Sequence, residues 1–167
     1  MIYDFNGKSP NIDKTSYISP SVDVIGDVSI GKDSSIWFGS VLRGDMHYIE
    51  IGSRTNIQDN STIHVTTDLY PTIIGDEVTI GHNVIVHGCQ IEDRCLIGMG
   101  SIIMDGVVIG SGSLIGAGAL ISPGTNIPPN SLVVGLPGKI IRSTTSKEQN
   151  EIIERAQHYI DFSKKYI

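Results

Sequence analysis

An aliphatic residue recurs every six positions along most of this 167-residue chain. The series is interrupted three times and resumes each time. Its members are Ile18, Val24, Ile30, Ile36 and Leu42, then Ile51, Ile57 and Ile63, then Ile74, Ile80 and Val86, and finally Ile91, Ile97, Ile103, Ile109, Ile115, Ile121, Ile127 and Val133. A period of six fits neither a helix with 3.6 residues per turn nor an alternating strand, but it does fit a short strand followed by a tight turn.

Two further positions of the six-residue unit support this interpretation. A slim residue stands four places after most aliphatics, as at Ser34 and Ser61, and glycine often follows the aliphatic directly, as at Gly52 and Gly98. Three units would close a triangular coil of about 18 residues, and stacked coils pair their strands at roughly 4.8 Å. Each coil then buries the face of the next. A β-sandwich would instead need hairpin signals every 8–12 residues or so, and the sequence has none.

With these repeats, the chain resembles the hexapeptide-repeat proteins, which fold as left-handed parallel β-helices. The resemblance implies an all-β domain, a triangular prism, over residues 1–140. The composition then changes, and residues 141–167 predict a C-terminal α-helix of roughly 17–20 residues that packs on the β-helix. Ser146 and Gln149 have the spacing of a capping box. The predicted packing face of this helix consists of Ile152, Ile153, Ala156, Tyr159, Ile160 and Ser163.

Composition and charge narrow the possible partners and the compartment. The formal net charge of −6 argues against nucleic acid or an anionic membrane surface as a partner. No apolar run approaches the roughly 20 residues that a membrane-spanning helix needs, and the first residues do not resemble a signal peptide. Two cysteines, Cys89 and Cys95, are too few for a disulfide scaffold. We therefore expect a cytoplasmic protein.

The repeat fixes which side chains share a face, and this brings histidines together. The units that open at Leu42, Ile63 and Val86 fall on one face if the extra residues around 46–50 and 68–73 loop out. The residues that follow these three aliphatics are Arg43, His64 and His87. They should form one outward column, in which the two imidazoles lie on successive coils.

A third histidine belongs to a different face. His82 belongs to the unit that opens at Ile80, and Gln58 and Asp59 belong to the unit that opens at Ile57, one coil earlier on the same face. Two imidazoles are too few for a tight zinc site, which needs three or four protein ligands. In a cyclic homotrimer, the face with two histidines could meet His82 of the next subunit. Each interface would then hold a three-histidine metal site with open coordination positions, as catalytic sites have.

Several short motifs sharpen the resemblance. Arg43-Gly44-Asp45, Asn56-Ile57-Gln58-Asp59, His64 and the run from Gly81 to Gly88 resemble the γ-class carbonic anhydrases. In that family one subunit supplies the first and third histidines, which correspond to His64 and His87, and its neighbour supplies the middle one, His82. The resemblance further implies that Arg43, Asp45 and Asp59 brace the trimer interface through salt bridges. It assigns Gln58 to a hydrogen bond with the metal-bound water and Asn56 to the pocket wall.

The implied reaction is the reversible hydration of CO₂ to bicarbonate. Zn²⁺, with Fe²⁺ or Co²⁺ as alternatives, would lower the pKa of a bound water to about 7, and the resulting hydroxide would attack CO₂. The best-known members carry a Glu after the Arg-Gly-Asp run and a long acidic loop after the first histidine. This chain has Met46 and a short loop, residues 65–71, with Asp68 as its single carboxylate. We therefore expect slow proton export and weak activity.

Other functions and roles stay open at this point. The hexapeptide-repeat scaffold also carries acyltransferases that use acetyl-CoA, a thioesterase could use the same metal site, and a metal-stabilised trimer could be a non-catalytic scaffold. Cys95 should lie in the core, whereas Cys89 is either a core residue or a fourth ligand. Tyr159, on the predicted helix, could either pack the helix against the β-helix or reach the pocket. His47 and His158 lie outside the pattern and should be exposed, although His47, in the insertion after Asp45, could reach the edge of the pocket.

Overall fold

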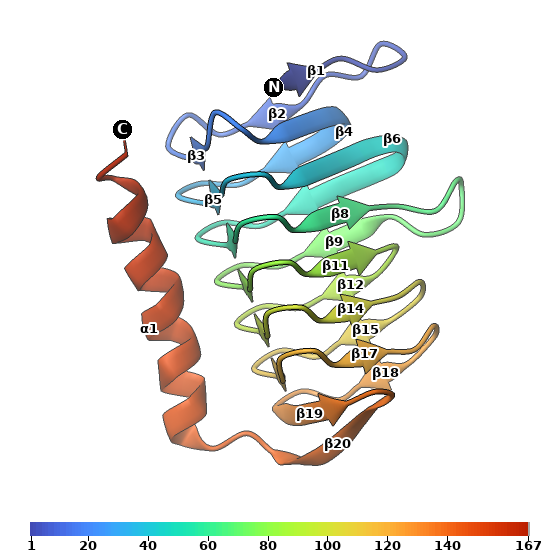
Figure 1. Cartoon of the computed structure of the whole chain (residues 1–167), viewed down its shortest axis with the longest axis vertical. Helices are drawn as coiled ribbons and strands as arrows, with labels where there is room; N and C mark the ends of the chain where they lie inside the picture. The colour runs from blue at the N-terminus through green and yellow to red at the C-terminus, as the bar shows by residue number, and fades with distance from the viewer. Residues whose placement is uncertain (167) are drawn as a thin grey trace.

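The fold is a stack of triangular coils with one helix beside it (Figure 1). The structure, a computed structural model, describes residues 1–166. Successive coils form a parallel β-helix of about seven turns, and the C-terminal helix runs back along the stack (Figure 1). This confirms the predicted class, a left-handed parallel β-helix of hexapeptide repeats with a C-terminal helix.

Each coil contributes one short strand to each of three faces, which we name after one of their strands. The β8 face holds β8 (Thr62–His64), β11 (Ile85–His87), β14 (Ile102–Ile103) and β17 (Leu120–Ile121). The β9 face holds β9 (Thr72–Ile74), β12 (Gln90–Ile91), β15 (Val108–Ile109) and β18 (Asn126–Ile127). The β10 face holds β3 (Tyr17–Ile18), β5 (Ser35–Ile36), β7 (Asn56–Ile57), β10 (Thr79–Ile80), β13 (Leu96–Ile97), β16 (Leu114–Ile115), β19 (Ser131–Gly135) and β20 (Gly138–Ser143).

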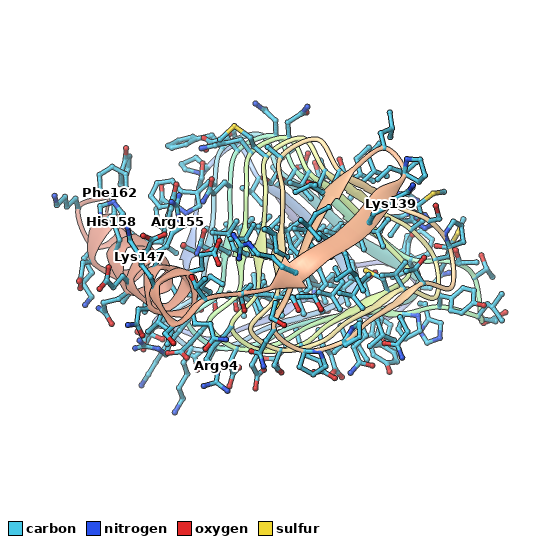
Figure 2. The ribbon with its side chains drawn as sticks, turned by 90° about the horizontal axis from the view of Figure 1, so that it is seen from below. Arg94, Lys139, Lys147, Arg155, His158 and Phe162 are labelled. Carbon is cyan, nitrogen blue, oxygen red and sulfur yellow. The ribbon has the colours of Figure 1, made fainter. Side chains whose placement is uncertain are left out.

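The long strand β6 (Val41–Ile51) pairs with both β8 and β9 and so joins the β8 and β9 faces into one 12-stranded sheet. A second long strand, β4 (Asp23–Ile30), pairs with β6 in parallel. The short strands β1 (Ile2–Tyr3) and β2 (Asn11–Ile12) pair with β4 at the N-terminal end of the stack. Across the last coil, β20 folds back antiparallel on β19, and Figure 2 shows it crossing the end of the prism.

Both predicted insertions are present, but each returns to the sheet earlier than expected. The pairing of β4 with β6 jumps from Gly26↔Gly44 to Val28↔Ile49, so residues 45–48 lie opposite Asp27 alone, which makes three residues extra, and 49–50 are paired. The second insertion leaves the coil after His64, as the loop that projects in Figure 1, and Thr72 already belongs to β9. The prediction of 68–73 for this loop was therefore wrong in its bounds.

The repeating aliphatics point inward and form one continuous core. From Val24 to Val133 they are almost fully buried. The slim positions lie beside them, where Ser34 and Ser61 donate hydrogen bonds to backbone carbonyls one coil further along, at 2.7 and 2.9 Å. Cys95 occupies such a position, and it is fully buried, as predicted. The six-residue pattern is thus the pattern of the core.

Helix α1 (Ser146–Ser163) lies along the β10 face. Its buried residues are Ile152, Ala156, Ile160 and Ser163, whereas Ile153, predicted to pack, is 37% exposed at the rim. On the coil side, the Trp37 ring stacks on Phe162 at a centroid distance of 5.5 Å. Within residues 1–166 no helix combines the length and the apolar character needed to cross a membrane.

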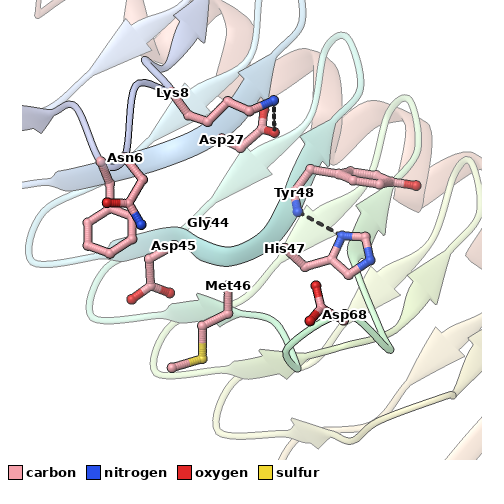
Figure 3. Close-up of a pocket in the computed structure, with 10 residues that line it drawn as sticks. Asn6, Lys8, Asp27, Gly44, Asp45, Met46, His47, Tyr48 and Asp68 are labelled. Atoms are coloured by element: carbon pink, nitrogen blue, oxygen red, sulfur yellow. Dashed lines mark hydrogen bonds and ion pairs between the residues drawn. The ribbon is translucent and has the colours of Figure 1, made fainter.

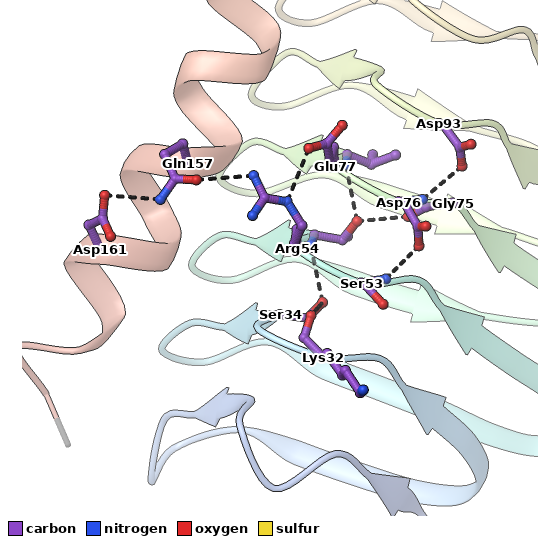
Figure 4. A network of polar contacts seen from close by, with 12 residues as sticks. Lys32, Ser34, Ser53, Arg54, Gly75, Asp76, Glu77, Asp93, Gln157 and Asp161 are labelled. Atoms are coloured by element: carbon purple, nitrogen blue, oxygen red, sulfur yellow. Dashed lines mark hydrogen bonds and ion pairs between the residues drawn. The ribbon is translucent and has the colours of Figure 1, made fainter.

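A polar network fastens the helix to the coil corners (Figure 4). The Arg54 guanidinium donates to Glu77 of the next coil and to Gln157 of α1, both at 3.0 Å. Nearby, the Asp93 carboxylate accepts a hydrogen bond from the backbone N–H of Asp76 at 2.9 Å (Figure 4). These contacts link successive coils to each other and to α1, which holds the helix at a fixed height along the stack.

The capping box of α1 lies one residue earlier than the predicted pair Ser146 and Gln149. Thr145 is the N-cap, and its side chain and that of Glu148 each accept the other's backbone N–H. Arg142 holds the Glu148 carboxylate with two hydrogen bonds of 2.8 Å, one to each oxygen, a two-point ion pair that a neutral glutamine with one acceptor oxygen could not form. The prediction was right about the kind of cap and wrong about its residues.

Candidate functional site

His64 and His87 face each other on adjacent strands of the β8 face. They end β8 and β11, which pair in parallel with His87 directly opposite His64. The Nδ1 atom of His64 lies 3.0 Å from the Nε2 atom of His87. The predicted column of two imidazoles on successive coils is therefore present in this chain.

A carboxylate lies beyond each imidazole. Asp45 Oδ1 lies 3.2 Å from His64 Nε2, and Asp105 Oδ1 lies 2.6 Å from His87 Nδ1. The four side chains thus form the row Asp45, His64, His87, Asp105. Asp105 was not predicted. The available signal was its separation of 18 residues from His87, one coil further along at the same corner.

The Arg43 guanidinium holds the Asp45 carboxylate at 2.6 Å from Oδ2. Burial raises the pKa of Asp45, but the hydrogen bonds from Arg43 and His64 outweigh burial and leave it below its usual value. Burial, together with the positive charge of Arg43, lowers the pKa of His64 despite the hydrogen bond to Asp45. The pair therefore favours an ionised Asp45 next to a neutral imidazole, which is the form that binds metal ions.

His82 lies at another corner of the prism, between β10 and β11. It is half exposed, and its Nδ1 atom lies 2.9 Å from Asp59 Oδ2. The strand β11 separates it from His87. Across residues 1–166, no three His, Cys, Asp or Glu side chains are grouped so that they could hold a metal ion. One chain therefore presents a histidine pair at one corner and a single histidine at another.

The repeats match two sequence families of the hexapeptide type. Residues 88–123 match the family described as bacterial transferase hexapeptide (six repeats). Residues 48–88 and 71–104 match the hexapeptide repeat of succinyl-transferase. A solved structure of a putative acetyltransferase from Bacillus cereus is 45% identical, with a TM-score of 0.97, and the match covers 99% of this chain and 95% of that one.

Curated relatives are more specific. A probable carbonic anhydrase from Methanocaldococcus jannaschii is 53% identical over 153 residues, which are 92% of this chain and 96% of that protein. The mitochondrial γ-carbonic anhydrase 2 of Arabidopsis thaliana is 45% identical over 94% of this chain. The chain belongs to the γ-class carbonic anhydrase family. It spans 58% of the length of the plant relative.

Two residues that the γ-class resemblance places near the metal are buried on the β10 face. Asn56 and Gln58 are 1% and 4% exposed. The Gln58 amide donates to Asn56 Oδ1 at 3.1 Å, and the Asn56 amide donates to Thr79 Oγ1 at 2.8 Å. Within residues 1–166, neither side chain forms a hydrogen bond with a histidine. The corner that carries His82 lies next to Gln58 along the coil direction, so these amides accompany the single histidine and not the pair.

The predicted γ-class salt-bridge residues also divide between the two corners. Arg43 and Asp45 pair beside His64, and Asp59 pairs with His82. Within this chain Asp59 therefore does not join the Arg43–Asp45 pair. The two groups would have to come from different subunits to form one network.

A pocket of about 240 Å³ opens beside Asp45 (Figure 3). The insertion that follows Asp45 forms one wall, with Met46, His47 and Tyr48, and Asp68 lies across from it. His47 is half-buried and lines this pocket, which agrees with the alternative that it reaches the pocket edge and not with full exposure, and its Nδ1 atom accepts the backbone N–H of Tyr48 at 2.9 Å. His158 is exposed on α1, as predicted.

Cys89 and Tyr159, the two remaining candidates, both have packing roles in the structure. Cys89 is 4% exposed and belongs to the hydrophobic core, and burial raises the pKa of its thiol. It is therefore not presented to the histidines as a ligand. Tyr159 packs edge-on against Trp37 at a centroid distance of 5.4 Å. Burial raises the pKa of Tyr159, and the charge of Asp59 adds to this.

Proposed function

We propose that this chain is a metal-dependent γ-class carbonic anhydrase that hydrates CO₂ at sites between the subunits of a homotrimer. The observation that carries the proposal is the row Asp45, His64, His87, Asp105, with a single exposed His82 at a different corner of the same chain. A cyclic trimer would bring the pair of one subunit to the single histidine of the next. The γ-class membership supports this reading.

The hydrogen bonds of His64 and His87 leave the nitrogens between the two rings free to bind a metal ion. When His64 donates its Nε2–H to Asp45 and His87 donates its Nδ1–H to Asp105, neutral rings have no proton left for the contact between them. The two inner nitrogens then present lone pairs to each other at 3.0 Å. Ligand nitrogens of a tetrahedral zinc site lie about 3.3 Å apart, given bonds of about 2.0–2.1 Å. A divalent cation between the rings would relieve this conflict.

The residues of the chain have separate tasks in the proposed site. A metal held by His64, His87 and His82 of the neighbouring subunit would supply the Lewis acid that activates water towards CO₂. The carboxylates of Asp45 and Asp105 fix the two rings, as carboxylates beside metal-binding histidines do. Gln58, with Asn56 behind it, would direct its amide at the reacting oxygen, and Arg43 of one subunit would pair with Asp59 of the next. We propose Zn²⁺, with Fe²⁺ or Co²⁺ as alternatives.

Slow proton export should limit this activity. Met46 is 49% exposed where an ionisable side chain could have carried protons away. His47 is the imidazole nearest to the pocket, but protonation at Nδ1 would break its hydrogen bond with the Tyr48 N–H. Asp68 is then the remaining carboxylate of the loop, and it is exposed. We therefore propose weak hydration of CO₂.

Metal content and mass in solution test this proposal together. Protein purified without chelator should be a trimer with about one metal ion per chain, and His82→Ala should lose the metal. His158→Ala is the matched control, because this histidine is exposed on α1 and is not one of the proposed ligands. It should keep the metal. A metal-free wild-type trimer would refute the proposed site.

An acyltransferase is the second candidate, because the Bacillus cereus neighbour is named a putative acetyltransferase. Binding of coenzyme A by a metal-free trimer would favour it. If the metal is present, assays of CO₂ hydration and thioester hydrolysis separate a carbonic anhydrase from a thioesterase. Stoichiometric metal with neither activity would favour a metal-stabilised scaffold.

A further inference from the structure

Asp105 makes two contacts, one on each carboxylate oxygen. Oδ1 lies 2.6 Å from Nδ1 of His87, and Oδ2 accepts a hydrogen bond from the Thr66 hydroxyl at 2.9 Å. The carboxylate is about one third exposed. Its backbone is held as well, because its carbonyl accepts the N–H of Gly124 from the next coil at 2.8 Å. Asp105 therefore comes to the imidazole from a fixed corner.

Thr66 is itself fixed by the loop that follows His64. Its backbone N–H donates to the carbonyl of Tyr70 at 2.9 Å, and its own carbonyl accepts from Leu69 and Tyr70. Gly88 leaves room for the contact between Asp105 and His87. Its φ is +56°, and a Cβ there would lie 2.5 Å from Asp105 Oδ1 and 2.9 Å from the Tyr70 Cβ. The loop, the glycine and the carboxylate thus form one arrangement around His87.

The backbones of both histidines are fixed without Asp105. β8 and β11 pair in register, and the buried Thr72 hydroxyl donates to the His64 carbonyl and accepts the N–H of Gly88. The orientation of the imidazole about its Cβ–Cγ bond is a softer variable, since such torsions have broad minima. Neither backbone contact determines which ring nitrogen carries the proton. Only a partner on the ring itself can decide this.

We propose that Asp105 is a positioning residue that fixes the ring and the tautomer of His87, with Thr66 holding its carboxylate in place. By accepting Nδ1–H, Asp105 leaves the lone pair on Nε2, the nitrogen that faces His64. The two ends of the row are then alike. Arg43 donates a hydrogen bond to Asp45 at one end, and Thr66 donates one to Asp105 at the other. The benefit of this tautomer, a free Nε2 ligand, rests on the proposed metal function, but the tautomer itself does not require a metal.

The first experiment measures the tautomer in metal-free protein. Imidazole ¹⁵N NMR of the wild type, with the His87 signals identified by their loss in His87→Ala, should show the proton on Nδ1. Asp105→Ala should shift His87 towards the Nε2–H tautomer, and Asp105→Asn, which keeps an acceptor oxygen, should restore much of the wild-type signal. Asp93→Ala is the matched control, since that carboxylate also lies at a coil corner but accepts only the N–H of Asp76. It should leave the His87 signals unchanged.

The second experiment measures Zn²⁺ affinity by competition with a colorimetric chelator. Asp105→Ala should raise the dissociation constant of Zn²⁺ about 10–100-fold, the usual cost of losing such a partner, with smaller increases in Asp105→Asn and in Thr66→Val. The melting temperature of the metal-free protein should fall no more than in Asp93→Ala. A larger fall that accounts for the lost affinity would reduce Asp105 to a structural residue and overturn the proposal.

The two experiments separate this proposal from the proposed function. If the wild type binds no Zn²⁺ but Asp105→Ala still changes the His87 tautomer, the metal function fails and the positioning role stands. If Asp105→Ala leaves both the tautomer and the Zn²⁺ affinity as in the wild type, Asp105 does not position His87.

Discussion

Ile85 offers a direct test of which faces meet in the proposed trimer. It lies on β11, points outward between the corners of His82 and His87, and is 42% exposed in the single chain. Its neighbour Val86 points into the core and is fully buried. If the β8 face packs against the next subunit, Ile85 becomes buried on assembly. Truncation to alanine should then weaken the trimer and leave the fold of each chain intact.

The size of the effect follows from the exposed fraction. Full burial of an isoleucine side chain is worth about 1.5–3 kcal/mol, so burial of the exposed two fifths is worth roughly 0.6–1.3 kcal/mol per interface. A cyclic trimer has three such interfaces, which gives roughly 2–4 kcal/mol per trimer. Because about 1.4 kcal/mol corresponds to a tenfold change, the association constant should fall about 30- to 700-fold.

Sedimentation velocity over a dilution series measures this fall, and thermal unfolding at low concentration measures the stability of the single chain. The matched variant is Ile73→Ala, which truncates an outward isoleucine on the β9 face. Ile73→Ala should leave assembly unchanged. Equal weakening by both variants, or an unaltered trimer in Ile85→Ala, would show that the β8 face is not the interface.

Three further predictions concern the fold. Ile97→Ala, in the middle of the core, should lower the free energy of unfolding by about 2–5 kcal/mol in urea titration; a smaller loss would mean that the coils can close the cavity. Arg142 and Thr145 hold the pKa of Glu148 at about 2, below its usual 4.5, so its contribution to stability is complete above pH 4.5 and is lost as the pH falls towards 2. The melting temperature of the wild type should therefore fall more over this range than that of Glu148→Gln, and parallel curves would contradict this. Burial raises the pKa of both cysteine thiols, that of Cys95 to about 12, so a thiol reagent should modify Cys89 and Cys95 only after unfolding.

The sequence predicted the fold and the histidine pair because one periodic pattern controls both. Once every sixth residue points inward, the neighbour of each aliphatic has a defined direction. The register of Ile63 with Val86 then places His64 beside His87. The same argument assigned His82 to a different corner, where the structure has it. In a repeating backbone, the side-chain directions of residues far apart in the sequence can therefore be predicted from the period.

The errors came from places where the period does not apply. The segment that begins Thr145-Ser146 contains two overlapping capping patterns, and the anchor that decides between them, Arg142, lies outside both. Asp105 was missed because it lies one residue beyond the partner of His87 in the strand register, at a corner where the side-chain direction depends on the turn. Corners and caps depend on local contacts that a period of six does not encode.

The length of α1 matches the height of the stack that it spans. Its 18 residues extend about 27 Å at 1.5 Å per residue. The five steps from β19 to β5 on the β10 face measure about 24 Å at 4.8 Å per step. Growth of the solenoid by one coil would therefore call for about three more helical residues, slightly less than one helical turn. Coil and helix are nearly commensurate, so a lineage could lengthen or shorten this fold in whole coils if α1 changed by about one turn each time.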